Sequence, residues 1–275
     1  MVDTDQLLRM ALAEDLGSGD ITTFATIAAE LKGGAVVFGR EPFVLSGSGP
    51  FQRVFELLDP EIKIESLFCD GTLIEPGTTV FKMEGKVAAL LGGERTALNL
   101  VQRLRGIATL TRKMVETIGE APCRLLDTRK TTPLWRSLEK EAVRHGGGKN
   151  HRFGLSDGIL IKDNHIAAAG GVAPSVRRAR QHAPHTLRIE VEVESIEQLR
   201  EAITAGADIV LLDNFSLAML KEAVAVTGGR VLLEASGGVT LDTVGAIAAT
   251  GVDFVSCGAL THSARAIDLT MEFSS

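Results

Sequence analysis

From Cys123 onward, short apolar segments recur, each ended by polar residues and followed by a helical pattern. They are RLLDTRK, GILIKDNH, LRIEVEVES, ADIVLLDNFS, RVLLEASGG and VDFVSCGAL. Nearly continuous apolar runs of this length indicate strands buried on both faces, as in a parallel sheet. The last four begin roughly 20 residues apart, the length of one βα unit with short loops. We therefore expect a βα barrel, and an incomplete one because a full barrel usually takes about 250 residues.

The region before about residue 115 has a different pattern. A helical start, DTDQLLRMALAEDL, precedes short segments such as GGAVVFGREPFVLSG and TTVFKMEG that Gly and Pro separate. This favours a small α+β domain whose first helix is capped by Asp3 or Thr4. GERTALNLVQRLRGIATLTRKMVETIG then predicts a long helix, with an interruption near Gly106. We place the domains at 1–108 and 109–275, and allow that the last residues pack back on the first domain.

Composition narrows the class of protein. A chain of 275 residues that is 45% hydrophobic can bury a barrel-sized core, while a net charge of -6 argues against a general nucleic-acid or anionic membrane surface. No apolar stretch reaches the roughly 20 residues of a membrane span, and the N-terminus lacks a signal-peptide core. We therefore expect a cytoplasmic enzyme. The odd, widely spaced cysteines, Cys69, Cys123 and Cys257, predict neither disulfides nor a metal site, and we expect them in the core.

Unusual polar residues stand at the ends of the predicted strands. In βα barrels the active site lies at these ends, so the side chains should converge on one mouth. Each charge taken alone is more often a solvated loop residue, but recurrence at the same point of successive units favours a site. The residues are Asp127, Thr128, Arg129 and Lys130; Lys162, Asp163 and Asn164; Glu192; Asp213 and Asn214; Ser236, Gly237 and Gly238; and Gly258.

Two basic groups are expected at this mouth. Arg129 and Lys130 follow one strand, and HGGGKNHR, just before the strand that ends in Lys162, adds further cations. Arg binds carboxylates or phosphates bidentately and Lys adds a compact charge, so the set suits a small substrate with several negative groups. For His151, a structural hydrogen bond and a substrate contact both stay open, and its place beside Arg152 in a Gly-rich loop favours contact.

Glu192 and Asp213 are paired carboxylates and candidate metal ligands. Alternation in IEVEVES puts Glu190, Glu192 and Glu194 on one face, where inward carboxylates need a cation. Mg²⁺ suits the pair because it prefers one or two carboxylates plus phosphate oxygens and water; ion pairs with Lys or Arg are the alternative. The turns SGG and CGALTHS at the last two strands suit a phosphate, although Gly-rich turns alone are weak evidence.

The segments DTRKTTPLWRSLEKEAV, GGGKNHRFGLSDGILIKDNHI, VEVE, LLDNF, LEASGGVT and CGALTHS together resemble the quinolinate phosphoribosyltransferase family. EDLGSGDITT and GERTALNL are also similar to it, so the resemblance spans nearly the whole chain. It implies an α/β fold in which an N-terminal open α/β sandwich precedes an incomplete, seven-stranded βα barrel. It also implies transfer of the phosphoribosyl group of phosphoribosyl pyrophosphate to quinolinate with decarboxylation, which gives nicotinate mononucleotide in NAD biosynthesis.

The resemblance also implies roles for single residues. Arg129, His151, Arg152 and Lys162 would contact quinolinate, and Thr128 would be a further substrate-binding residue. Lys130, Glu192 and Asp213 would act on the pyrophosphate, the ribose and Mg²⁺, and the 5-phosphate would lie on Ser236, Gly237, Gly238, Cys257, Gly258 and Ala259. Arg95 would come from a neighbouring subunit, so the resemblance implies a homodimer or a higher homo-oligomer, with no nucleic-acid or membrane partner.

Two departures and two competing functions accompany this interpretation. The family often has Pro-Gly where this chain has Pro133-Leu134-Trp135, and Ser-Gly-Ile-Ala where it has Arg105-Gly106-Ile107-Ala108, so packing near Arg105 can differ. One competing function is that of a relative with another substrate, such as the molybdenum-associated members; LIKDNH with Arg129 and Arg152 favours quinolinate. The other is a non-catalytic sensor of phosphorylated metabolites, which would not need Glu192 and Asp213 beside Lys130.

Overall fold

The computed structural model describes residues 3–274. The chain divides into two compact units. The N-terminal unit comprises Met1–Arg112, Thr132–Gly147 and Ala264–Ser275, and the C-terminal unit comprises Lys113–Thr131 and Gly148–Ser263. Each unit therefore contains segments that are distant in the sequence.

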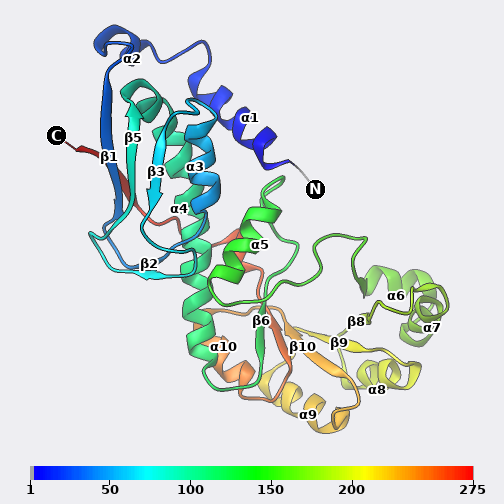
Figure 1. Cartoon of the computed structure of the whole chain (residues 1–275). Helices are drawn as coiled ribbons and strands as arrows, with labels where there is room; N and C mark the ends of the chain where they lie inside the picture. The colour runs from blue at the N-terminus through cyan, green and yellow to red at the C-terminus, as the bar shows by residue number, and fades with distance from the viewer. Residues whose placement is uncertain (1–2, 275) are drawn as a thin grey trace. The chain divides into compact units, whose positions relative to one another are not determined.

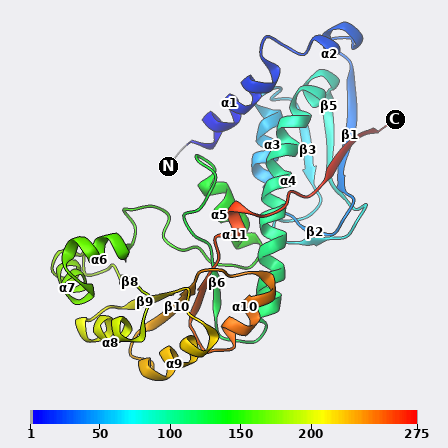
Figure 2. The ribbon, with the colours of Figure 1, turned by 180° about the vertical axis from the view of Figure 1, so that it is seen from behind.

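An antiparallel sheet with strand order β12-β1-β5-β3 organises the N-terminal unit (Figure 1). Its last strand comes from the end of the chain and pairs with β1, as the reverse view shows (Figure 2). The strands are β1 (Lys32–Gly39), β3 (Lys63–Ser66), β5 (Thr79–Lys86) and β12 (Leu269–Ser274), with a separate pair β2 (Phe43–Val44) and β4 (Leu73–Ile74). The helices are α1 (Thr4–Leu16), α2 (Ile21–Thr26), α3 (Ser48–Glu56), most of α4 (Val87–Ile118) and α5 (Arg136–His145).

Aromatic side chains fix α3 against this sheet. The ring of Phe51 in α3 stacks on Phe81 of β5 at a centroid distance of 4.3 Å, and Phe55 meets Phe51 edge-on at 5.2 Å. Such pairs add to the free energy of burial, which is already large for aromatic side chains. The first helix begins where its sequence predicts, because the Asp3 side chain accepts a hydrogen bond from the backbone N–H of Asp5.

The interruption expected near Gly106 is wrong, because α4 is one continuous helix of 32 residues. Gly106 serves a close contact instead: a Cβ there would lie 2.0 Å from the carbonyl oxygen of Arg265. The preceding Arg105 is fully buried, with its guanidinium 4.9 Å from the ring centroid of Phe43. None of its side-chain nitrogens has a hydrogen-bond partner among the described residues, and burial lowers the pKa of Arg105 to about 9.

The departure from the family pattern at Leu134 places this residue in an uncommon backbone conformation. Leu134 has a φ of 69°, in the left-handed region that glycine tolerates and a branched side chain does not favour. Its side chain is exposed, so little burial compensates for the strain. Trp135, the next residue, is the N-cap of α5. The Leu134 position is therefore one where the Gly of the family pattern fits the backbone better.

The C-terminal unit is an α/β structure built on a parallel six-stranded sheet with order β6-β11-β10-β9-β8-β7 (Figure 1). All six strands predicted from the apolar runs are present. They are β6 (Arg124–Leu126), β7 (Ile159–Ile161), β8 (Ile189–Val193), β9 (Ile209–Asp213), β10 (Leu232–Ser236) and β11 (Phe254–Ser256). The helices between and after them are α6 (Asp163–Ala169), α7 (Val172–His182), α8 (Ile196–Ala205), α9 (Leu217–Thr227), α10 (Leu241–Ala248) and α11 (Ala259–His262). One isolated parallel bridge joins Leu126 to Lys149 at the β6 edge.

Two expectations from composition can be compared with the structure. All three cysteines are free; Cys123 and Cys257 are buried, but Cys69 is exposed, so its expected place in the core is wrong. Its apolar neighbours in the sequence lie in a loop and not in a buried strand. Across residues 3–274, no helix combines the length and the apolar character that a membrane span requires.

Candidate active site

A pocket of about 670 Å³ lies at the C-terminal ends of the parallel strands. All of its lining residues belong to the C-terminal unit. The structure therefore brings together nearly every site residue predicted from the sequence. Those that line the pocket are Thr128, Arg129, Lys130, His151, Arg152, Lys162, Glu192, Asp213, Ser236, Gly237, Gly238, Cys257, Gly258 and Ala259.

Four cations line this pocket, Arg129, Lys130, Arg152 and Lys162, and two of them are held by hydrogen bonds to nearby residues. The carbonyl of Lys130 accepts from Thr261 Oγ1 at 2.8 Å, and its N–H donates to Thr128 Oγ1 at 3.0 Å. Arg152 donates from Nη1 to the carbonyl of Gly158 at 2.9 Å. Burial lowers the pKa of Arg152, and the charge of Arg129 lowers it further. Such a concentration of positive charge in a partly buried pocket favours an anionic ligand.

Asp127 anchors the loop that carries the second basic group. Its carboxylate is fully buried and accepts from the backbone N–H of His151 at 2.9 Å and from Asn150 Nδ2 at 2.5 Å. Two charge-assisted hydrogen bonds to one carboxylate hold residues 150–151 in place. Although it was predicted among the polar residues of the mouth, Asp127 does not line the pocket, and we identify it as a structural anchor.

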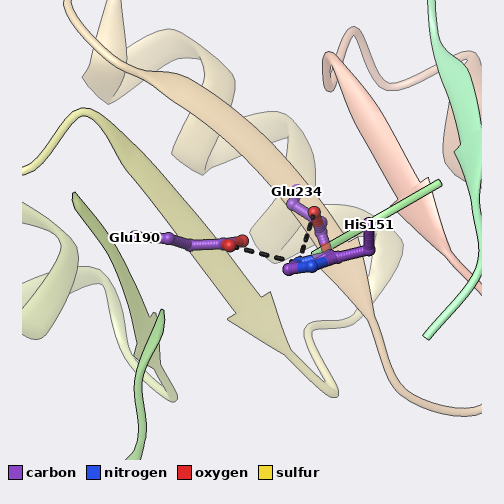
Figure 3. A group of neighbouring side chains, drawn as sticks. All are labelled: His151, Glu190 and Glu234. Atoms are coloured by element: carbon purple, nitrogen blue, oxygen red, sulfur yellow. Dashed lines mark ion pairs between the residues drawn. The ribbon is translucent and has the colours of Figure 1, made fainter. Parts of the chain in front are cut away.

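The two predicted metal-ligating carboxylates have different partners. Glu192 forms an ion pair with Lys162, which was the alternative to a metal. Asp213 accepts a hydrogen bond from Asn214 Nδ2 at 2.8 Å. A different group of side chains, His151 with Glu190 and Glu234, has the mutual distances of a metal site (Figure 3).

The turns after β10 and β11 each contain a glycine with little room for a side chain, and at Gly237 the backbone is also in the left-handed region. Gly237 has a φ of 95°, and a Cβ there would lie 2.1 Å from Asn214 Oδ1. A Cβ at Gly258 would lie 2.9 Å from Lys130 Cδ. These glycines leave backbone N–H groups accessible in the pocket, where a phosphate can approach them. Cys257 is no nucleophile at neutral pH, because burial raises the pKa of its thiol and Sγ contacts the carbonyl of Val239 at 3.4 Å.

Besides Asp127, the predicted residues Asp163, Asn164 and Arg95 do not line the pocket. Asp163 and Asn164 are exposed at the start of α6. Arg95 lies in α4 within the N-terminal unit, with a side chain that is 59% exposed and 3.8 Å from Glu94. Conversely, Glu234 and His262 line the pocket but were not among the site residues predicted from the sequence. Glu234 lies two residues before Ser236 on β10, so strand alternation from Ser236 could have placed it on the inner face.

Together, a parallel α/β unit and a strand-end pocket that combines four cations, three carboxyl groups and glycine turns define a site for a small, phosphorylated, polyanionic substrate. The family model of the quinolinate phosphoribosyl transferase N-terminal domain matches residues 20–105, and that of the C-terminal domain matches residues 107–272. The chain belongs to the quinolinate phosphoribosyltransferase family.

Individual relatives agree with this membership. The chain is 44% identical over 267 residues to a probable nicotinate-nucleotide pyrophosphorylase [carboxylating] of Bacillus subtilis (strain 168), which covers 97% of this chain and 92% of the relative. It is 43% identical in sequence to the crystal structure of NadC from Streptococcus pyogenes, with a TM-score of 0.94 over 98% of this chain and 96% of that chain. The nicotinate-nucleotide pyrophosphorylase structure from Francisella tularensis gives a TM-score of 0.95 at 43% identity, covering 100% of this chain and 98% of that one.

Proposed function

We propose that this chain is a quinolinate phosphoribosyltransferase (decarboxylating), which forms nicotinate mononucleotide, pyrophosphate and carbon dioxide from quinolinate and phosphoribosyl pyrophosphate for NAD biosynthesis. The observation that carries the proposal is the convergence of Arg129, Lys130, Arg152 and Lys162 on one pocket. Quinolinate has two carboxylates and the second substrate has a phosphate and a pyrophosphate. Four cations match this combined negative charge better than they match a neutral metabolite.

Each end of the pocket suits one part of the substrates. Arg129, Arg152 and Lys162 bind the two carboxylates of quinolinate and orient its ring nitrogen. The 5-phosphate of the ribose lies on the glycine turns at Ser236–Gly238 and Cys257–Ala259, where backbone N–H groups are accessible. Lys130, which contacts the Gly258 turn, neutralises the pyrophosphate.

The reaction begins when the pyridine nitrogen attacks C1 of the ribose. The bond from C1 to the pyrophosphate oxygen breaks, and the pyrophosphate leaves with the electron pair. Positive charge develops on the ribose in this kind of transition state, and the carboxylates of Glu192 and Asp213 stabilise it. The bond from C2 of the pyridine to its carboxylate then breaks and carbon dioxide departs. The electron pair stays on C2, beside the now cationic nitrogen, until a proton adds there.

We also propose that Glu192 and Asp213 bind Mg²⁺. Two carboxylates fit this ion, which retains water and takes phosphate oxygens as its other ligands. Bound there, Mg²⁺ would neutralise the leaving pyrophosphate. Because Glu192 is paired with Lys162 in the structure, binding of the ion would have to compete with that ammonium group.

The proposal also covers the fold of the two units, the oligomeric state and the cellular location. The bridge at Lys149 supports a seventh strand that extends the six-stranded sheet towards a barrel, and the N-terminal unit would be the open α/β sandwich, with a boundary near residue 108. A homodimer or larger homo-oligomer would supply Arg95 to the pocket of a neighbouring subunit. A cytoplasmic location stays a prediction from the sequence.

A parallel assay with quinolinate, nicotinate and nicotinamide tests the proposed substrate. Loss of one charge-assisted contact costs about 1.5 to 3 kcal/mol, so kcat/KM for nicotinate should be lower by about tenfold to over a hundredfold. Nicotinamide, which has no carboxylate, should react more slowly still. Equal turnover of nicotinate and quinolinate would contradict the assignment, and tight binding of either without turnover would favour a sensor.

A further inference from the structure

The imidazole of His151 separates two cavities within the C-terminal unit. His151, Arg152 and Glu234 line both the strand-end pocket and a second cavity of about 410 Å³. The second cavity also contacts Ile159 and Ile209, the first residues of β7 and β9, so it lies at the opposite ends of the strands. His151 therefore occupies the floor of the active-site pocket.

Both ring nitrogens of His151 have partners within the protein. The backbone N–H of Arg152 donates to Nδ1 at 2.7 Å, so Nδ1 is an acceptor and carries no hydrogen. Nε2 lies 3.1 Å from Glu190 Oε2 and 3.6 Å from Glu234 Oε2 (Figure 3). An imidazole that accepts at Nδ1 carries its proton on Nε2, which then donates to Glu190.

This hydrogen-bond pattern excludes two other states of the ring. An imidazolium would have a hydrogen on Nδ1 that points at the N–H of Arg152. A metal ion bound by the group in Figure 3 would need the lone pair of Nε2, which is absent in this tautomer. The distances that suit a metal therefore belong to a hydrogen-bonded group.

The surroundings also disfavour a positive charge on the ring. The strand-end pocket presents four cations, Arg129, Lys130, Arg152 and Lys162, against the carboxylates of Glu192 and Asp213. The second cavity adds the cations Arg124, Lys149 and Arg188 against the carboxylate of Asp157, and Asp127 accepts from the backbone N–H of His151. The two carboxyls of the group are almost fully buried. Burial raises the pKa of Glu234 to about 8 and the charge of Glu190 raises it further, whereas a positive charge on His151 would lower it.

We propose that His151 is an uncharged positioning residue, held with its proton on Nε2 by Glu190 and Glu234, and that it orients Arg152 and adds no positive charge to the site. The contact from Nδ1 fixes the backbone N–H of Arg152, while Asp127 fixes that of His151. Glu190 and Glu234 are thus positioning residues that act on the substrate through the ring. The proposal depends on the proposed function only for what Arg152 binds.

Nitrogen NMR of the ¹⁵N-histidine-labelled full chain without substrate tests the state of the ring directly. His151→Asn identifies the signals of His151. At pH 6.0, where an unperturbed histidine with a pKa of about 6.5 is mostly protonated, His151 should show one protonated nitrogen, Nε2. Signals of an imidazolium, or of the tautomer protonated on Nδ1, would overturn the proposal whether or not the chain turns over quinolinate.

Two substitutions of Glu190 distinguish a role in positioning the His151 ring from a role in stabilising the fold alone. Glu190→Gln keeps an oxygen that can accept from Nε2, whereas Glu190→Met removes it at similar volume. With Glu190→Met, KM for quinolinate should rise by about tenfold, with KM for phosphoribosyl pyrophosphate within about twofold. Glu190→Gln should restore most of the quinolinate affinity, and the exposed Glu222→Gln is the control.

Other results would contradict the positioning role. Equal increases of both KM values in Glu190→Met, or no recovery in Glu190→Gln, would show that the carboxyl supports the fold alone. Stoichiometric Mn²⁺ or Zn²⁺ bound by wild type and lost in Glu190→Met would show that the group is a metal site.

Discussion

Lys162 forms an ion pair with Glu192 at the mouth of the pocket. Lys162 follows β7, and Glu192 is the penultimate residue of the neighbouring strand β8. The pair joins a residue proposed to bind quinolinate to one proposed to act on the ribose and Mg²⁺. In this arrangement Glu192 neutralises part of the positive charge that attracts the first substrate. Removing the carboxylate charge should therefore affect binding and turnover in opposite directions.

Glu192→Gln should bind quinolinate more tightly in the absence of the second substrate and turn over more slowly. The Lys162 side chain is 45% exposed, so the screened pair is worth about 0.5 to 1 kcal/mol, and the dissociation constant for quinolinate should fall about twofold to fivefold. The kcat should fall at least about tenfold with loss of one group that stabilises the transition state. Calorimetry and steady-state kinetics measure the two effects, with the exposed Glu194→Gln as control. Weaker quinolinate binding in Glu192→Gln would show that the pair orients Lys162 and does not compete with the substrate.

Gly237→Ala should destabilise the protein and weaken the site for the 5-phosphate. The new Cβ would lie 2.1 Å from Asn214 Oδ1 at a residue whose φ is 95°. A loss of about 1 to 3 kcal/mol in the free energy of unfolding and a higher KM for phosphoribosyl pyrophosphate should follow. Gly238→Ala, whose Cβ would meet no atom within 4 Å, should lose less. If the two variants unfold at the same urea concentration, the contact with Asn214 does not limit this turn.

Arg105→Met should stabilise the N-terminal unit. Burial of a charge without a hydrogen-bonding partner costs several kcal/mol, and the contacts with the rings of Phe43 and Phe81 return about 0.5 to 2 kcal/mol each. We expect a gain of about 1 to 3 kcal/mol at pH 7 by urea unfolding, against less than about 0.5 kcal/mol for Arg144→Met on the surface.

The pH dependence of this gain has a definite sign. Burial lowers the pKa of Arg105 to about 9, well below its ordinary value, so above about pH 9 the unfolded chain binds more protons than the folded one. Wild-type stability should therefore rise towards that of Arg105→Met as pH increases above about 9. A variant less stable than wild type at pH 7 would show that the guanidinium stabilises the fold.

Arg95→Ala should be nearly inactive yet folded if Arg95 serves a neighbouring subunit. Loss of an Arg that binds a substrate carboxylate should cost roughly 2 kcal/mol or more of binding free energy. The control Arg177→Ala, at an exposed position, should change activity little. Mixing Arg95→Ala with Arg129→Ala chains should restore activity, because one pocket of each heterodimer would carry neither defect. If subunit exchange is demonstrated and activity stays absent, Arg95 acts within its own chain or on stability alone.

Much of the pocket could be predicted because of where parallel strands end. Lys162 and Asp213 stand where a buried apolar run stops and Glu192 is the penultimate residue of β8, and such strand ends meet at one edge of a parallel sheet. The apolar runs themselves predict the six strands, since a strand covered on both faces has little place for polar residues.

The group in the pocket floor could not be predicted in the same way. Glu190 and Glu234 lie on β8 and β10, which β9 separates, and both meet a loop residue, His151. Their proximity depends on strand register and sheet curvature, which sequence spacing does not determine. The close contact at Gly106 could not be predicted either, because the residue it approaches, Arg265, is distant in the sequence.

The central claim is the decarboxylating transfer of a phosphoribosyl group to quinolinate. The most direct measurement follows quinolinate labelled in its C2 carboxylate and quantifies carbon dioxide, pyrophosphate and nicotinate mononucleotide in the same reaction. The account predicts equal amounts of all three, formed only when phosphoribosyl pyrophosphate is present. Release of pyrophosphate without labelled carbon dioxide, or no product from quinolinate under conditions where another pyridine carboxylate reacts, would contradict it.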